Sequence, residues 1–344
     1  MHNSDPDNSK CRIVVDAMGG DFAPQNAVIG AIQAFSEKKN FDLFLVGKVQ
    51  AIKKVLSEHN LSFDEEKIIN AEEVIEMSDI PTNAIKTKPD SSIVVGARWV
   101  KEKKADAFVS AGNTGAMMAA STLIIGRIPG VGRATIGTLM PNSTGITTVF
   151  DVGASVDSKP RHLLEYAVMG TIFTQEIYGI QNPKIGILSV GEEDSKGNEV
   201  SLAAAELIKK TNLNFFGNVE GRDVLKGTVN VVVCDGFVGN ILIKFGEGVL
   251  DFLKFKFKDY AGKNLFNKIK IGLLRSSLKE ILKDFDYQEQ GGVPLLGING
   301  IVIIGHGSST PKAIKNMVLR AHEMYEKNLV SKIENSIQKY SSLT

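Results

Sequence analysis

The sequence has few of the residues that mark several large classes of protein. Two cysteines and one tryptophan occur among 344 residues. Cys11 and Cys234 lie far apart, and Cys234 follows the apolar run Val231–Val233, so neither a disulfide framework nor a cysteine metal cluster is indicated. No apolar run reaches the length of about 18 residues that a membrane-spanning helix needs. Forty Lys and Arg residues balance 39 Asp and Glu residues, which excludes a chain-wide attraction to nucleic acid.

Several short catalytic motifs are also missing. No GxGxxG follows a predicted strand, which weakens a dinucleotide-binding interpretation. The sequence has no GxxxxGK[ST], GxSxG or HExxH. A P-loop kinase, a covalent serine hydrolase and a zinc protease of the HExxH type are therefore disfavoured.

What is present is an apolar content of 43%, enough for a sizeable core. The first residues are polar and lack a signal-peptide pattern, and the cysteine usage is typical of a cytoplasmic protein. We predict a disordered tail over residues 1–11, a single α/β domain over 12–330, and a C-terminal helix end or tail over 331–344.

Short β-branched runs end repeatedly in polar turns and are followed by helix-like periodicity. This pattern predicts a doubly wound, mostly parallel α/β sheet of Rossmann-like type. The predicted strands are Arg12–Val15, Asp42–Val46, Ala107–Ser110, Thr135–Leu139, Ile146–Phe150, Lys184–Val190, Asn230–Cys234 and Gly300–Ile304.

Six turns after these strands are rich in Gly, Asn, Ser and Asp. Because ligands bind at the carboxyl ends of strands in open α/β sheets, we expect the six turns to line one cleft. They are residues 16–21, 110–115, 151–155, 191–198, 235–240 and 306–309.

Two of these turns resemble anion cradles. Asn113, Thr114 and Gly115 stand where a helix would begin, so backbone N–H groups and a hydroxyl could meet a phosphate or carboxylate. His306, Gly307, Ser308 and Ser309 precede Pro311, which suits a first helical position. The alternative is that both segments are ordinary helix caps and that His306 is a structural histidine.

Two further turns carry side chains suited to acyl-transfer chemistry. Lys196 lies among three carboxylates between Gly191 and Asn198, where it could hold a phosphate or neutralise an oxyanion; a solvated, charge-balanced turn is the alternative. Between Asp235 and Asn240, two glycines favour close approach of backbone to ligand. The Asn240 amide could donate to a developing oxyanion.

One segment, residues 249–285, lacks the strand-like runs that alternate with helical periodicity elsewhere in the sequence. Its periodicity predicts a helix from Val249 to about Tyr260, a turn at Ala261 and Gly262, and a second amphipathic helix. Residues 251–283 contain nine Lys or Arg and three Asp or Glu, a net charge of +6. We therefore predict a protruding, basic, amphipathic hairpin. Its apolar residues include Phe257, Phe266, Ile269, Leu273, Leu274, Leu278, Ile281, Leu282 and Phe285.

Five blocks of the sequence, in order from Arg12 to about Tyr325, resemble the signature blocks of the acyl-ACP:phosphate acyltransferase family (PlsX). They are Asp16–Pro24, Ser110–Ala116, Gly191–Glu199, Asp235–Asn240, and Pro294–Gly300 with His306–Ser309. The resemblance implies a fold like that of isopropylmalate dehydrogenase and phosphotransacetylase. Three departures, at Ala134, Ser155 and Val238, leave details of the predicted cleft open.

The resemblance also implies a reaction. Members of the family transfer a fatty acyl group from acyl carrier protein to inorganic phosphate, without a cofactor or metal, for phosphatidic acid and phospholipid synthesis. Lys196 and Asn240 would then be catalytic. Residues expected to bind phosphate or position substrate are Asp16, Gly19, Gly20, Asn113, Thr114, Gly115, Gly191, Asn198, Asp235, Gly239, His306, Gly307, Ser308 and Ser309.

The expected partners are acyl carrier protein, a second copy of the chain, an anionic membrane surface and a membrane-bound glycerol-3-phosphate acyltransferase downstream. The hairpin could serve peripheral membrane attachment, dimerisation or carrier-protein contact. The alternatives kept open are an acetyl- or butyryltransferase acting on coenzyme A thioesters and a non-catalytic lipid-responsive binding protein. A related hydroxy-acid dehydrogenase is less favoured, because its ligand clusters are not evident.

Overall fold

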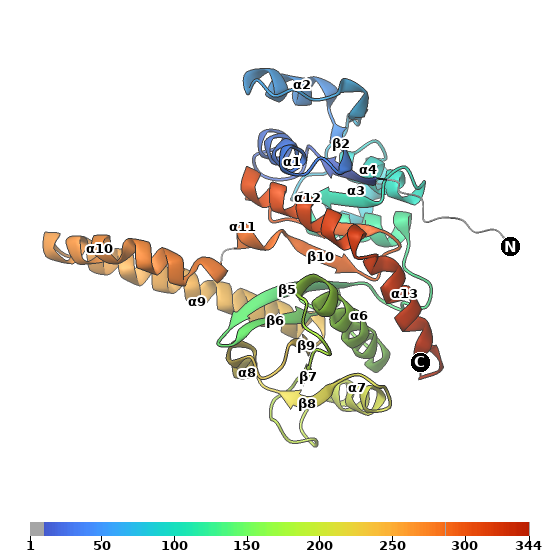
Figure 1. The fold of residues 1–344 in the computed structure, drawn as a ribbon, viewed down its shortest axis with the longest axis vertical. Helices are drawn as coiled ribbons and strands as arrows, with labels where there is room; N and C mark the ends of the chain where they lie inside the picture. Colours follow the sequence, from blue (N-terminus) through green and yellow to red (C-terminus); the bar gives the residue numbers. More distant parts are fainter. Residues whose placement is uncertain (1–9, 286, 344) are drawn as a thin grey trace. The chain divides into compact units, whose positions relative to one another are not determined.

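A computed structural model describes residues 10–285 and 287–343 (Figure 1). Residues 1–9 of the predicted tail lie outside this description, and Cys11 already belongs to the first strand. The chain forms two compact units. Unit 1 comprises Met1–Ala134, Glu176–Gly179 and Gln290–Ser342, and unit 2 comprises Thr135–Gln175, Ile180–Glu289 and Leu343–Thr344. The single-domain organisation stays a prediction.

Unit 1 contains strands in the order β3-β2-β1-β4-β11-β10. The central pairs are parallel, and only β10 runs antiparallel to its neighbour β11. The strands β1, β4 and β11 therefore end at the same edge. The bounds are β1 Cys11–Asp16, β2 Phe41–Gly47, β3 Ile68–Asn70, β4 Ala107–Ser110, β10 Val293–Leu296 and β11 Ile301–Ile304.

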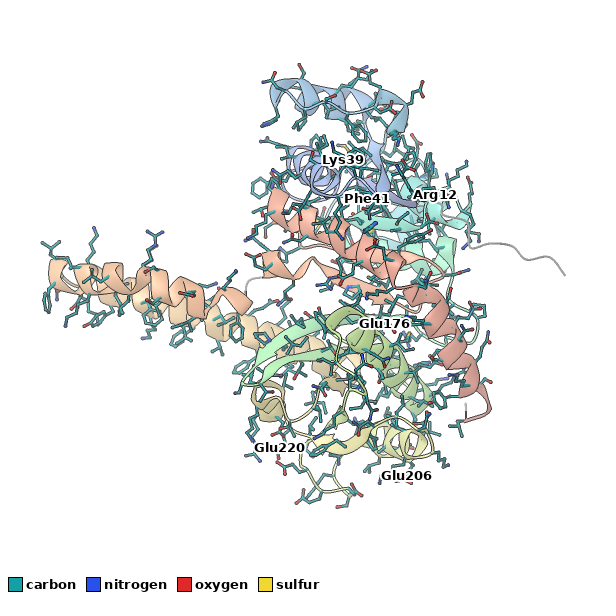
Figure 2. The ribbon with its side chains drawn as sticks, in the orientation of Figure 1. Arg12, Lys39, Phe41, Glu176, Glu206 and Glu220 are labelled. Carbon is teal, nitrogen blue, oxygen red and sulfur yellow. The ribbon has the colours of Figure 1, made fainter. Side chains whose placement is uncertain are left out.

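The central strands of unit 1 form because they are short runs of β-branched and aromatic residues, almost completely buried. Arg12 and Phe41, labelled in Figure 2, show how the sheet is held: Arg12 Nη2 pairs with Asp106 Oδ1 at 2.9 Å, and Phe41 packs against His322. The helices are α1 Gln25–Glu37, α2 Val49–Glu58, α3 Pro81–Thr87, α4 Ser92–Lys101, α5 Thr114–Ala120, α12 Pro311–Glu326 and α13 Leu329–Lys339.

Unit 2 contains strands in the order β5-β6-β9-β7-β8, with β5 antiparallel to β6 and the other pairs parallel. The strands β6, β7, β8 and β9 therefore end at one edge. The elements are β5 Thr135–Asn142, β6 Gly145–Phe150, α6 Pro160–Tyr178, β7 Ile185–Leu188, α7 Glu199–Lys209, β8 Phe215–Val219, α8 Gly221–Lys226, β9 Val231–Val233, α9 Gly236–Gly262, α10 Leu265–Ile281 and α11 Tyr287–Gln290.

The helical hairpin of unit 2 is present, but its bounds differ from the prediction. Helix α9 begins at Gly236 rather than Val249, because Asp235 caps its first turn and nothing interrupts the helix before Gly262. Helix α10 ends at Ile281, and a separate 3₁₀ turn covers Lys283–Phe285. Within the described residues, no helix is long and apolar enough to span a bilayer.

All eight predicted strands are confirmed, with ends that shift by a few residues. The prediction missed β3, β8 and β10. Strand β3 has three residues, β8 contains Gly217 at φ +117°, and β10 contains Pro294. Each of these features weakens a strand pattern in the sequence.

Candidate functional site

The first group of predicted residues surrounds the carboxyl end of β1 in unit 1. Asp16 is buried, and its Oδ2 accepts a 2.6 Å hydrogen bond from Ser110 Oγ at the end of β4. Its Oδ1 accepts from the Met18 N–H at 2.9 Å. Burial raises the pKa of Asp16, and hydrogen bonds from Ser110, Ser92 and Met18 oppose this shift. Asp16 thus joins the ends of two parallel strands.

Two glycines let the 16–21 turn approach its neighbours. A Cβ on Gly19 would lie 2.6 Å from Asp16 Oδ2 and 2.7 Å from the Gly112 nitrogen. Gly20 has φ +106°, a conformation that favours glycine. Asp21 N–H then donates to the Gly307 carbonyl at 2.8 Å. The structure therefore brings three predicted turns of unit 1 together.

Asn113 ties a loop to the start of α5. Its Oδ1 accepts from the Ala116 N–H at 3.0 Å, so it is the helix cap considered as an alternative above. Its Nδ2 lies 3.1–3.2 Å from the carbonyl oxygens of Glu76, Met77 and Asp79. Both ends of the amide are thus engaged within the protein, and a role for Asn113 in substrate binding stays a prediction.

The neighbours of Asn113 have different surroundings. Thr114 is exposed. Gly115 lies against α3, where an added Cβ would be 2.5 Å from Pro81 Cγ. Thr114 therefore offers the accessible hydroxyl of this block.

The 306–309 turn follows β11 and leads into α12. His306 is exposed, so it is not a buried core histidine. Its Nδ1 accepts from the Ser308 N–H at 3.2 Å and lies 2.8 Å from Ser308 Oγ. Ser309 is buried, and its carbonyl accepts from Asn26 Nδ2 at 3.0 Å. Thr310 caps α12, so helix capping accounts for part of this segment.

The second group lies in unit 2, on the loop after β7. Lys196 is exposed, and no ion pair is found for it within the described residues. Its backbone is fixed: Asn218 Nδ2 donates to the Glu193 and Lys196 carbonyls at 2.8 and 2.9 Å. Asn198 caps α7 through the Ser201 N–H. An added Cβ on Gly191 would lie 3.0 Å from Lys196 Cγ.

Two of the three carboxylates of the Lys196 loop, Glu192 and Asp194, have cationic partners of their own. Asp194 pairs with Lys209 of α7, which also contacts Glu206. Glu192 pairs with Arg222 of α8 at 3.5 Å. Glu192 and Asp194 are thus engaged elsewhere, and the exposed Lys196 side chain is in no ion pair among the described residues.

The turn after β9 opens helix α9. Asp235 Oδ1 accepts from the Val238 N–H at 3.0 Å, and the Asn240 side chain is exposed. Gly239 packs directly on the 151–155 turn, since a Cβ there would overlap the Asp151 carbonyl oxygen at 1.8 Å. Asn240 therefore projects from a helical turn whose backbone is seated on the end of β6.

The sequence interpretation did not select Asp151, Ser110, Asn218 or Arg222 as site residues. Asp151 is completely buried, and its Oδ1 accepts from the N–H groups of Ile136, Gly153 and Ala154 at 3.0–3.2 Å. Burial raises the pKa of Asp151, while these backbone donors oppose the shift. Its place in the 151–155 turn, directly after a strand, was the signal in the sequence.

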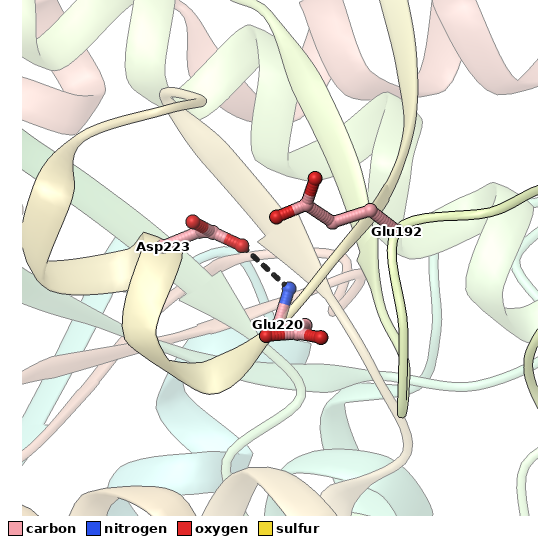
Figure 3. A group of neighbouring side chains, drawn as sticks. All are labelled: Glu192, Glu220 and Asp223. Carbon is pink, nitrogen blue, oxygen red and sulfur yellow. Dashed lines mark hydrogen bonds between the residues drawn. The ribbon is translucent and has the colours of Figure 1, made fainter.

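Three carboxylates of unit 2 have the geometry of a metal-ligand set: Glu192, Glu220 and Asp223 (Figure 3). Their surroundings explain them otherwise. Arg222 contacts Glu192 and Glu220, Lys226 pairs with Asp223 at 3.0 Å, and the Glu220 N–H donates to Asp223. Burial pushes the pKa of Asp223 upward, but the Glu220 N–H and Lys226 outweigh it and the pKa is lowered. Arg222 and Lys226 therefore already offset two of the three negative charges of the group.

The structure thus gathers the predicted residues within each unit at the carboxyl edge of its strands. In unit 1, the 16–21 turn contacts both the 110–115 and 306–309 turns. In unit 2, the 235–240 turn contacts the 151–155 turn. No hydrogen bond or ion pair among the described residues joins Lys196 to Asn240. The single cleft shared by all six turns stays a prediction.

Comparison with known proteins identifies the family. A family model described as "Fatty acid synthesis protein" matches residues 11–332. A phosphate acyltransferase of Halothermothrix orenii is 44% identical over 330 residues, covering 95% of this chain and 99% of the relative. The chain belongs to the phosphate acyltransferase family. A relative from Dictyoglomus turgidum is 46% identical over 330 residues, with 95% and 98% covered. A phosphate acyltransferase is an acyltransferase, so the chain is an enzyme of that class.

Solved structures of other proteins share the fold of this member of the phosphate acyltransferase family. A phosphotransacetylase from Streptococcus pyogenes has a TM-score of 0.63 at 20% identity, covering 92% of this chain and 94% of that one. The EutD phosphotransacetylase from Staphylococcus aureus has a TM-score of 0.58 at 16% identity, with 92% and 94% covered. The predicted phosphotransacetylase-like fold is confirmed.

Two of the three departures from the family pattern, Ser155 and Ala134, are buried, and the third, Val238, is exposed. Ser155 is buried, and a Cβ on Gly236 would lie 2.4 Å from its carbonyl oxygen. Ala134 is buried. The Val238 side chain is partly exposed, and its N–H is used by Asp235. The Ser155 backbone therefore packs against the first residue of α9.

Proposed function

We propose that this protein transfers a fatty acyl group from the thioester of acyl carrier protein to inorganic phosphate. Phosphate oxygen attacks the thioester carbonyl carbon, the C–S bond breaks, and acyl phosphate and the free carrier thiol form without a covalent enzyme intermediate. The observation that carries the proposal is the exposed Asn240 amide at the start of the second turn of α9, in a chain whose relatives are phosphate acyltransferases.

This chemistry suits a site without a nucleophilic triad. Phosphate is anionic near neutral pH and a thioester is an activated acyl donor, so the protein has two tasks: to position the reactants and to stabilise the tetrahedral oxyanion. Cys11 and Cys234 are buried and burial raises the pKa of both thiols, which argues against a covalent thioester on the enzyme.

Lys196 and Asn240 are assigned to the developing charge. Lys196 supplies an exposed cation on a loop where two of the three carboxylates, Glu192 and Asp194, have other partners. Asn240 supplies a neutral donor for the carbonyl oxygen, and the positive end of the α9 dipole lies at the turn just before it. One such oxyanion donor contributes about 3–4 kcal/mol to transition-state stabilisation.

The groups of unit 1 are assigned to phosphate and to the carrier arm. Thr114, His306 and Ser308 present polar side chains at the carboxyl edge of that unit, and Asp16, Gly19, Gly20 and Gly307 fix the turns beneath them. With these assignments we keep, as part of the proposal, the expectation from the sequence that the six polar turns line one cleft.

The test combines purified protein, long-chain acyl carrier protein and inorganic phosphate, and follows phosphate-dependent release of free carrier and acyl phosphate. Lys196→Ala should lower kcat about a hundredfold or more. Lys210→Ala, an exposed lysine of the same unit, should change kcat less than about twofold. Turnover of short acyl coenzyme A alone would favour the coenzyme A alternative. An absence of product with every donor would favour a binding protein.

The hairpin of α9 and α10 is assigned to a membrane surface. Its apolar side chains are exposed, with Phe266 at 66% and Leu273 at 77%, and its outer part is basic. Burying such a face in the boundary region of an anionic bilayer releases apolar surface from water and pairs lysines with lipid charge. Long acyl chains and a membrane-bound glycerol-3-phosphate acyltransferase downstream would suit this location for a cytoplasmic protein.

Flotation with phosphatidylglycerol vesicles tests the membrane assignment. The variant Leu273→Glu with Leu274→Glu should lose flotation, whereas Leu225→Glu, an exposed leucine on α8, should keep it. Equal flotation of all three proteins would contradict the assignment.

Sedimentation analysis of the same proteins tests the expected homodimer, because a dimer built on the hairpin would dissociate in the double variant and not in the control.

A further inference from the structure

A buried carboxylate under the first turn of α9 has no assigned role in the proposed reaction. Asp151 is 0% exposed, and its Oδ1 is occupied by three backbone N–H groups. Its Oδ2 is also buried and has no hydrogen-bond partner within the described residues, although the Ser155 backbone N–H also favours the charged form of the side chain and so opposes the rise in its pKa on burial. A buried, unpaired carboxylate oxygen lowers stability, so its presence calls for an explanation other than stability.

The unpaired oxygen faces the start of α9. A Cβ on Gly236, the first residue of that helix, would lie only 2.6 Å from Asp151 Oδ2. The absence of a side chain at Gly236 is what lets the carboxylate approach this end of the helix. The N-terminus of a 27-residue helix carries partial positive charge, so an ionised carboxylate there attracts the helix end.

Further contacts join the same aspartate to the same turn. Gly239 packs on the Asp151 carbonyl oxygen, and Cys234 Sγ donates to that oxygen at 3.4 Å. Gly153, whose N–H binds Asp151 Oδ1, lies beside Asn240: an added Cβ would be 3.6 Å from Asn240 Oδ1. The backbone and the side chain of Asp151 thus both contact the residues of α9 that lead directly into Asn240.

We propose that Asp151 is a positioning residue for the acyltransfer reaction, which holds the first turn of α9 and thereby aims the Asn240 amide. This inference rests on the proposed function for its kinetic consequence. The carboxylate acts through the helix end and does not touch the reactants. Removing its charge should therefore impair Asn240 without adding a second, independent defect.

A double-mutant cycle tests this proposal. Asp151→Asn keeps the size of the side chain and removes its charge; it should lower kcat about tenfold or more while the phosphate KM changes less than about threefold. In an Asn240→Ala background, the same substitution should change kcat less than about twofold. Equal losses in both backgrounds would overturn the proposal, because they would show that Asp151 acts independently of Asn240.

Amide hydrogen exchange supplies a readout that needs no activity. Asp151→Asn should speed exchange in residues 237–241, and Asp223→Asn, a matched buried carboxylate on α8, should speed exchange only around α8 and leave kcat unchanged. Unchanged exchange in residues 237–241 would overturn the proposal even if the proposed reaction is not observed. If Asp151→Asn does not fold, Gly236→Ala, which displaces the helix start from the carboxylate, takes its place in the cycle and in the exchange measurement.

Discussion

Ser110 Oγ donates a 2.6 Å hydrogen bond to the buried carboxylate of Asp16 and links the carboxyl ends of two neighbouring parallel strands. The same hydroxyl accepts from the Gly112 N–H at 3.0 Å. One serine thus fixes both the buried carboxylate and the backbone just before Asn113. The predicted phosphate-binding blocks of unit 1 depend on each other through this side chain.

The first prediction concerns Ser110→Ala. It leaves the buried Asp16 with one donor fewer, and we expect it to lower the free energy of unfolding by about 1–3 kcal/mol. Urea unfolding of wild type and variant at neutral pH measures the difference. Ser36→Ala, which removes a hydroxyl bonded only to a carbonyl within its own helix, is the control and should cost less.

The second prediction concerns pH. Because burial raises the pKa of Asp16 above its usual value of 3.8, the folded state binds this proton more tightly than the unfolded state does. Stability contributed by this proton is therefore lost as pH rises from about 3.8 through the folded-state pKa. Asp16→Asn should reduce the fall in unfolding free energy over this range, and Ser110→Ala should extend the fall to higher pH. Unfolding curves at a series of pH values decide; identical slopes for all three proteins would contradict the assignment.

The sequence was sufficient to predict the α/β class and the strands that carry the turns. These strands, such as Val231–Val233, are buried on both faces and read as apolar runs that lead into a polar turn, here at Asp235 after Cys234. It was not sufficient to place α9 correctly. Exposed apolar residues such as Phe245 continue the helix between Asn240 and Val249. The glycines Gly236 and Gly239 suggested a ligand-binding loop, but they are buried residues of the helix that pack closely on the 151–155 turn.

The predicted site shows the same division. Motif position predicted Lys196, Asn240 and Asp16 as site residues, a prediction that stays open, and it could not tell which polar groups are already engaged. Asn113 illustrates this: its sequence context suits an anion site, whereas its amide bonds to a helix N–H and lies within bonding distance of three loop carbonyls. Those carbonyls come from residues 34–37 positions away, a pairing that only the tertiary structure reveals.

The third prediction follows from those contacts. Asn113→Asp preserves the cap to Ala116 but places a carboxylate oxygen against the carbonyls of Glu76, Met77 and Asp79. We expect a loss of about 2–4 kcal/mol of stability and faster amide exchange in residues 76–80. Asn214→Asp, which removes a single exposed bond to the Asn182 carbonyl, should lose about 1 kcal/mol or less. Similar effects from the two substitutions would argue against a loop held by Asn113.

The fourth prediction concerns Asn240 itself. Asn240→Ala should lower kcat about 10²–10³-fold with little change in stability, because its side chain is exposed and has no hydrogen-bond partner among the described residues. Glu247→Ala, further along the same helix and paired with Lys244 at the surface, is the matched control and should retain kcat. Steady-state kinetics at saturating phosphate measure both. If Asn240→Ala keeps the wild-type kcat, Asn240 is not the oxyanion donor.

The last prediction compares two glycines on α9. Gly239→Ala should destabilise the protein by about 1–3 kcal/mol or more, because its Cβ would overlap the Asp151 carbonyl oxygen at 1.8 Å and the helix would have to shift. Gly248→Ala places the same methyl group where nothing lies within 4 Å, so the higher helix propensity of alanine should stabilise the helix by about 0.5–1 kcal/mol. Thermal unfolding of the two variants should therefore move in opposite directions. If both glycines tolerate alanine equally, α9 is not seated on Asp151, and Asn240 must be positioned by some other contact.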